Sequence, residues 1–219
     1  MIELTPDLIL KAYACGVFPM AERHDAAEVY WIDPDFRGIL PLESFHVPRR
    51  LARTVRSGIY EVRIDTDFLG TIKGCARRTQ KRRDTWLNAQ LIRVFTELHG
   101  RGYAHSVEVW RERRLVGGLY GVALGAVFFG ESMFSVEPDA SKVALVALVE
   151  RLRRGGYTLL DTQFVTAHLR RFGAIEVPRS QYLAQLGEAL ARRASFYSAD
   201  EAGGRAAALA GRQSTTQTS

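Results

Sequence analysis

The sequence predicts an α+β protein with a small N-terminal subdomain and a larger domain, whose mixed, mostly antiparallel sheet is flanked by helices. The first observation behind this prediction is a run of three strand-like stretches joined by tight turns in the second half of the chain. The second is a long amphipathic stretch directly after them, followed by a short apolar strand and a short helix. With 219 residues, 47% of them hydrophobic and 25% charged, the composition is globular and excludes a wholly disordered or fibrous chain.

The N-terminal stretch predicts a short, separate unit. Residues 6–15 have a helical pattern with Pro6 in the first turn, and Gly16 ends it. A turn is expected where Trp31 leads into an Asp-Pro-Asp sequence. We assign residues 1–35 to a small N-terminal subdomain.

The middle of the chain alternates helices with one strand. Residues 48–57 predict a helix that starts at a proline, and residues 60–64 alternate as a strand does. Two further helices are expected at residues 67–77 and 88–100, the second with Asn88 as N-cap and Gly100 as stop signal.

The second half predicts an antiparallel meander followed by a helix, a strand and a helix. The expected strands are residues 103–110, 115–124, 126–134 and 157–160, and the expected helices are residues 139–154 and 166–172. Asp139 is the expected N-cap of the long helix. This order is that of an acetyltransferase-like core, so residues 36–197 are assigned to such a catalytic domain. The composition after Ser198 predicts a disordered tail over 198–219.

The loop that enters the long helix argues against coenzyme A as a substrate. Enzymes of this shape wrap a pyrophosphate with glycine-rich backbone at that point. Residues 133–141 contain no glycine and two acids. The fold is therefore expected without its usual thioester donor.

A basic surplus suggests a polyanionic partner. The formal charge is +6, and most of the basic residues are arginine. Arg49, Arg53 and Arg56 fall on one helical face, where they repel each other unless an anion binds. A basic run at residues 77–83 precedes Trp86, and this pairing of charge with a ring suits single-stranded nucleic acid. A solvated surface helix and a disordered loop are the alternative interpretations.

The chain offers no metal or membrane signal. Its two cysteines and scattered histidines lack the spacing of a metal site, so no metal and no cofactor are expected. The N-terminus lacks the basic and apolar regions of a signal peptide, and no stretch is apolar enough to span a membrane. We expect a cytoplasmic protein.

Several motifs together resemble the bacterial leucyl/phenylalanyl-tRNA–protein transferases. The most specific are the sequences GESMFS at residues 130–135 and DASK at residues 139–142. The remaining matches, in the family's order and spacing, are GVFP at 16–19, WIDP at 31–34, FH at 45–46, DTW at 84–86, HSVEVW at 105–110, LVGGLYGV at 115–122 and LDTQ at 160–163.

This resemblance implies an activity and its chemistry. Such enzymes move leucine or phenylalanine from charged tRNA to the N-terminal Arg or Lys of a protein, which marks that protein for degradation. The resemblance assigns proton handling at the attacking amine to Asp161 and Gln163. We hypothesise that Gln163 accepts a hydrogen bond from the amine and that Asp161 polarises the amide. A strand-end turn residue is the alternative reading of Asp161.

The same resemblance and the residue chemistry imply the other contacts. Glu131 sits among apolar residues, where burial is costly unless it has a partner, so we expect it to bind the basic side chain of the acceptor. The implied walls of the aminoacyl pocket, which would also admit methionine, are Leu119, Phe128, Met133, Leu145 and Leu160. The implied tRNA contacts are Trp86, Arg49, Arg53, Arg56 and Met20, the last of which stands where the family commonly has tryptophan.

Two other function classes stay open at this point. A thioester-dependent N-acyltransferase is one, and acetyl-CoA binding would distinguish it. A non-catalytic RNA-binding module is the other, and it predicts that replacing Asp161 leaves function intact. For the transferase reading the expected partners are tRNAs charged with Leu, Phe or Met and proteins with N-terminal Arg or Lys, with the enzyme acting as a monomer.

Overall fold

The computed structural model describes residues 4–79, 83–198 and 201. Apart from Ser198 and Glu201, the tail predicted to be disordered lies outside the described residues, as do residues 80–82 of the basic run before Trp86. The helices are α1 (Pro6–Ala14), α2 (Arg49–Arg56), α3 (Phe68–Ala76), α4 (Ala89–Gly100), α5 (Ala140–Arg154), α6 (Ala167–Arg170) and α7 (Arg179–Leu190). The strands are β1 (Phe18–Ala21), β2 (Val29–Ile32), β3 (Phe36–Ile39), β4 (Glu61–Ile64), β5 (Ala104–Arg111), β6 (Arg114–Leu124), β7 (Val127–Ser135), β8 (Leu159–Gln163) and β9 (Ile175–Pro178).

A seven-stranded mixed sheet forms the centre of the molecule. Its strand order is β4-β5-β6-β7-β8-β3-β9, and a separate antiparallel hairpin pairs β1 with β2. Only the β7–β8 pair of the large sheet is parallel, and α5 connects these two strands. The predicted α+β class with a mixed, mostly antiparallel sheet is confirmed.

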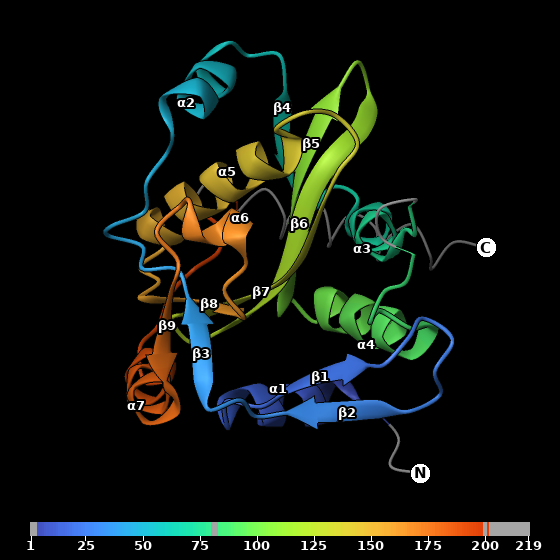
Figure 1. Cartoon of the computed structure of the whole chain (residues 1–219), viewed down its shortest axis with the longest axis vertical. Helices are drawn as coiled ribbons and strands as arrows, with labels where there is room; N and C mark the ends of the chain where they lie inside the picture. Colours follow the sequence, from blue (N-terminus) through green and yellow to red (C-terminus); the bar gives the residue numbers. More distant parts are fainter. Residues whose placement is uncertain (1–3, 80–82, 199–200, 202–219) are drawn as a thin grey trace, which may run out of the picture.

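Helices cover both faces of the sheet, as Figure 1 shows. Helices α3 and α4 lie on one face and α5 and α6 on the other. Two buried apolar clusters correspond to these layers. The α3–α4 cluster also contains Ile9 and Tyr13 of α1 and Tyr182 of α7, so the N-terminal and C-terminal helices share one core.

The long predicted elements are found within a few residues of their expected bounds, and Asn88 caps α4 by accepting a hydrogen bond from the Leu91 N–H at 2.9 Å. Asp139 stands at the N-cap position of α5 as expected, but its side chain forms no capping hydrogen bond. Asp139 adopts a left-handed backbone and its carboxylate accepts from Lys142 Nζ at 2.6 Å instead. The Ser141 N–H donates to Ser135 Oγ at 3.1 Å, so a serine from β7 takes over part of the capping.

A β-bulge in β7 places Glu131. Gly130 pairs with Gly121 and Ser132 pairs with Tyr120, which leaves Glu131 without a cross-strand partner. Bulges of this kind redirect a side chain and are common beside active sites. Opposite the bulge, a Cβ on Gly121 would collide with the Phe129 carbonyl oxygen and the Phe128 ring, so only glycine fits there.

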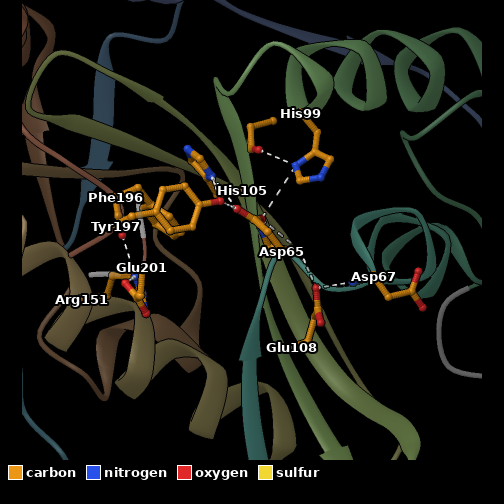
Figure 2. A network of polar contacts seen from close by, with 11 residues as sticks. Asp65, Asp67, His99, His105, Glu108, Arg151, Phe196, Tyr197 and Glu201 are labelled. Atoms are coloured by element: carbon orange, nitrogen blue, oxygen red, sulfur yellow. Dashed lines mark hydrogen bonds and ion pairs between the residues drawn. The ribbon is translucent and has the colours of Figure 1, made fainter. Parts of the chain in front are cut away.

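A polar network ties the C-terminal segment to the far end of the sheet (Figure 2). Asp65 accepts hydrogen bonds from Tyr197 Oη and from the Ser106 N–H, and its Oδ2 lies 2.8 Å from His105 Nδ1. Arg151 pairs with Glu201 through Nη2 at 2.7 Å. Burial alone would raise the pKa of Asp65, but these hydrogen bonds lower it. The network therefore anchors the segment that follows α7.

Candidate active site

One cavity of about 400 Å³ is lined by eight of the thirteen residues singled out by the sequence. Its apolar wall consists of side chains from the five elements β6, β7, α5, β8 and α6, which are Leu119, Met133, Leu145, Leu148, Leu160 and Leu169. Its polar part comes from the middle of β7 and the end of β8 and includes Glu131 and Gln163. A pocket of this size with few polar groups is typical of a small-molecule or side-chain site.

Met20 and Trp86 line the same cavity, and the segments that carry them contact each other. The Ala21 N–H donates to the Trp86 carbonyl oxygen at 3.3 Å, and the Trp86 ring meets the buried Phe95 ring edge-on with centroids 6.5 Å apart. Asp84 accepts from the His24 and Thr85 N–H groups, and these bonds lower the pKa of its carboxyl to about 2. The β1–β2 hairpin thus fixes the position of Trp86.

Glu131 is a partly buried carboxyl with an unusual proton affinity. Burial raises its pKa to about 8, and the nearby Asp161 charge adds to this, while the hydrogen bond from Tyr13 Oη at 2.6 Å works against it. The same contact and burial raise the pKa of Tyr13 well above its ordinary value. A pKa of about 8 favours the protonated form of Glu131 near neutral pH, and a nearby cation would favour the carboxylate.

Gln163 stands at the end of β8 in a left-handed backbone conformation, with φ of 55°. This conformation is uncommon for a residue with a side chain and is found at functional sites. Its amide nitrogen finds partners in the carbonyl oxygens of Thr162 at 3.1 Å and Gly130 at 2.8 Å. The atom that faces Glu131 Oε1, 3.4 Å away, is then the amide oxygen.

Asp161 lies behind the cavity and does not line it. It is fully buried and forms a two-pronged ion pair with Arg37, through Nε at 3.0 Å and Nη2 at 2.7 Å. It also accepts from Tyr182 Oη at 2.7 Å and from the Gln163 N–H at 2.8 Å. The hypothesis that Asp161 polarises the Gln163 side-chain amide needs correction, because the contact is with the main-chain N–H. Asp161 holds the strained backbone that carries Gln163.

Phe128 is the one predicted pocket wall that the structure places elsewhere. Its ring is fully buried and stacks on Phe196 with centroids 5.5 Å apart, and Tyr157 meets it edge-on. Tyr157 follows α5 and Phe196 follows α7. These two rings pack against Phe128, which therefore does not line the cavity. The other four predicted walls line the cavity.

The predicted arginine face lies on α2, which packs beside α5 away from the small hairpin (Figure 1). Leu51 anchors α2 in the α5-side core, and Arg49, Arg53 and Arg56 are exposed. Within the described part of the chain, none of the three forms an ion pair. Their charges are available to an external anion.

Sequence reasoning missed three residues that build the site. Arg37, Tyr13 and Tyr182 reach Asp161 or Glu131 across the fold, and the Arg37 guanidinium also stacks over the Phe18 ring at 4.4 Å. A basic residue in an otherwise apolar short strand was the one available signal for Arg37. No described helix has the length and apolar character needed to cross a membrane. No group of three metal-ligating side chains is present among the described residues.

The fold and the site define an α+β protein with a seven-stranded mixed sheet, in which the neighbouring strands β7 and β8 border an apolar cavity with one partly buried acid. The solved structure of FemX has a similar fold, with a TM-score of 0.50 and 14% identity over 82% of this chain and 70% of FemX. The family model described as leucyl/phenylalanyl-tRNA protein transferase matches residues 39–187, and the model of that transferase's N-terminal domain matches residues 2–35. The chain belongs to the leucyl/phenylalanyl-tRNA protein transferase family.

Curated relatives with that name match nearly the whole chain. The leucyl/phenylalanyl-tRNA–protein transferase of Paramagnetospirillum magneticum is 59% identical over 196 residues, which cover 90% of this chain and 94% of the relative. The leucyl/phenylalanyl-tRNA–protein transferase of Nitrobacter winogradskyi is 58% identical over 194 residues, which cover 89% of this chain and 86% of the relative.

Proposed function

We propose that this chain transfers leucine, phenylalanine or methionine from aminoacyl-tRNA to the N-terminal Arg or Lys of an acceptor protein. The acceptor α-amine attacks the ester carbonyl carbon, a C–N bond forms and the ester C–O bond breaks. The ribose oxygen of the tRNA leaves and takes the proton that the amine loses. The observation that carries this proposal is that an apolar pocket, the partly buried acid Glu131 and the strained Gln163 meet in one cavity.

The apolar wall suits the donor side chain. Leu119, Met133, Leu145 and Leu160 offer buried aliphatic and thioether surface with no fixed charge. Removing one methylene from such a ligand changes binding by about 1–3 kcal/mol, so leucine and phenylalanine are held and methionine is admitted.

Glu131 suits the cationic side chain of the acceptor. A guanidinium or ammonium group entering the cavity stabilises the carboxylate form and releases its proton. Among the described residues that line the cavity, Glu131 is the one acid. An uncharged or acidic N-terminal residue would leave Glu131 protonated or repelled.

Gln163 suits the attacking amine. An α-amine has a pKa of about 7.7–8.0, so a useful fraction is neutral near pH 7 and no strong base is required. The amide oxygen of Gln163 accepts a hydrogen bond from this amine and orients it, and Asp161 holds the backbone of Gln163 through its N–H. Positioning of this kind contributes about 7–11 kcal/mol to intramolecular reactions.

The tRNA side consists of the exposed arginines of α2 and the cavity rim. Arg49, Arg53 and Arg56 contact phosphates of the acceptor stem, and Trp86 and Met20 contact the terminal adenosine. The product carries a bulky apolar N-terminal residue that marks the protein for degradation in the cytoplasm, and the enzyme acts as a monomer.

The test measures labelled leucine moved from charged tRNA to a peptide with N-terminal Arg. The wild type is expected to transfer, while Gln163→Ala at saturating acceptor loses about 100-fold in kcat, which is the size of effect expected when the attacking group is no longer positioned. Near-normal turnover by Gln163→Ala would refute its role. Tight acetyl-CoA binding without leucyl transfer would favour a thioester-dependent enzyme instead.

A further inference from the structure

Phe164 is an exposed aromatic ring beside the cavity. It directly follows Gln163, lines the cavity and is 46% exposed. Burying a phenylalanine ring is favourable by roughly 1.5–3 kcal/mol. The exposed ring beside the cavity therefore offers apolar surface that a bound ligand would bury.

Contacts of both the main chain and the ring fix the position of Phe164. The Phe164 N–H donates to the Thr162 carbonyl oxygen at 2.6 Å. On the other side Gly38 packs against the Phe164 main chain, where an added Cβ would lie 2.7 Å from the Phe164 carbonyl carbon. The ring meets the buried Phe18 ring edge-on, with centroids 5.6 Å apart and an interplanar angle of 78°. This edge contact leaves ring surface free to meet a ligand.

The surroundings of the ring fit a flat, uncharged aromatic ligand. Phe18, Met20 and Trp86 line the same cavity, so this part of it is rich in rings and thioether surface. Stacking on an aromatic side chain stabilises a nucleic-acid base by about 1–3 kcal/mol and tolerates an exposed edge. Glu131, which lines the polar part of the cavity, suits a cation rather than a base.

We propose that Phe164 supplies a stacking surface, in addition to Trp86, for the base of the terminal nucleotide of the donor tRNA. The inference rests on the proposed function, since that donor brings a purine attached to the ribose that carries the aminoacyl ester. Phe164 then positions the nucleoside, and the adjacent Gln163 positions the amine that attacks the ester carbonyl carbon. Two consecutive residues thus align the donor and the acceptor.

The test compares ring-keeping and ring-removing variants. Phe164→Leu keeps an apolar side chain without a π-face, whereas Phe164→Trp keeps the ring. The probe is the leucyl amide of 3′-amino-3′-deoxyadenosine, whose dissociation constant is measured by calorimetry beside that of leucinamide, which lacks the nucleoside. Phe36→Leu is the matched control, because Phe36 is 60% exposed and does not line the cavity.

We expect Phe164→Leu to weaken binding of the nucleoside probe about tenfold, within the range of one lost stacking contact, with leucinamide binding unchanged. Phe164→Trp and Phe36→Leu should bind the nucleoside probe as tightly as the wild type does. The KM for Leu-tRNA should rise in Phe164→Leu alone, and the KM for the acceptor peptide should be the same in all variants. Unchanged probe binding in Phe164→Leu, or a rise confined to the acceptor KM, would overturn the inference. Failure of the wild type itself to bind the probe and transfer leucine would instead refute the proposed function.

Discussion

At the scale of single residues, Glu131 is the group whose chemistry is most strongly altered by its surroundings. It sits in a bulge, loses solvent and lies near Asp161, and together these raise its pKa to about 8. The folded protein therefore binds a proton at Glu131 that the unfolded chain releases near pH 4.5. Such a group lowers the stability of the fold as the pH rises from about 4.5 to about 8.

The substitution Glu131→Gln should make the stability of the fold less dependent on pH. Glutamine mimics the protonated acid, so the variant should unfold at the same temperature as the wild type at pH 4 and at a higher temperature at pH 8.5. Thermal unfolding followed by circular dichroism at both pH values measures this. An equal difference at both pH values would show that the Glu131 proton is not involved.

The sequence predicted the positions of some site residues and not of others. Glu131 was recognisable as an acid in an apolar strand, and Gln163 through its motif. Phe128 was misplaced because the rings that cover it come from distant segments. Arg37 could not be assigned as the partner of Asp161, because the two are separated by 124 positions and no local pattern encodes that contact.

At the scale of elements, the pairing of β3 with β8 holds the site. Gly38 pairs with Gln163 and Ile39 with Asp161, with a register shift between them. The Arg37–Asp161 ion pair, 1% and 0% exposed, locks this irregular junction. Two strands far apart in the chain thereby keep Gln163 in its left-handed conformation.

The substitution Arg37→Met should destabilise the fold by about 3–5 kcal/mol, because it leaves the Asp161 carboxylate buried without its cation. Urea unfolding at pH 7 gives this value. The double variant Arg37→Met/Asp161→Leu removes both charges and should recover most of the loss. A loss below about 1 kcal/mol for Arg37→Met would contradict the role of the pair.

The long elements were predictable, whereas the short ones were predicted only in part, since β4, β8 and α6 were expected and β1, β2, β3 and β9 were not. Helices α4 and α5 and strands β5–β7 carry enough periodic positions to define a face. Strands β1, β2, β3 and β9 have four residues each, too few for a pattern, and exist because partner strands satisfy their backbone. Helix α7 begins at Arg179 with Pro178 as its N-cap, in a segment that sequence analysis left unassigned.

At the scale of the whole molecule, the positive charge has two separate uses. Arg37, Arg111, Arg151 and Arg179 are paired with acids and hold elements together. The exposed arginines of α2 face solvent at one end of the molecule, whereas α7 lies toward the other end (Figure 1). Within the described residues, Arg49, Arg53 and Arg56 thus form an exposed positive face on α2 that no ion pair neutralises.

Replacing Arg49, Arg53 and Arg56 together by glutamine should reduce the salt dependence of tRNA binding. Three phosphate contacts correspond to a slope of log affinity against log salt of about −2 to −3, so the variant slope should be shallower by that amount. The test measures the affinity for charged tRNA by filter binding at several salt concentrations between roughly 50 and 300 mM. The control replaces the exposed Arg192 and Arg193 after α7, and an equal change there would contradict the assignment.

The most direct measurement compares two acceptor peptides that differ in one charge. Labelled leucine is transferred from Leu-tRNA to a peptide with N-terminal arginine and to the same peptide with citrulline, an uncharged analogue of similar shape. The account predicts that the wild type prefers arginine by about 100-fold in kcat/KM, in line with a charge-assisted contact worth about 2–3 kcal/mol, and that Glu131→Gln removes this preference. Equal transfer to both peptides by the wild type, or no transfer to arginine, would contradict the account.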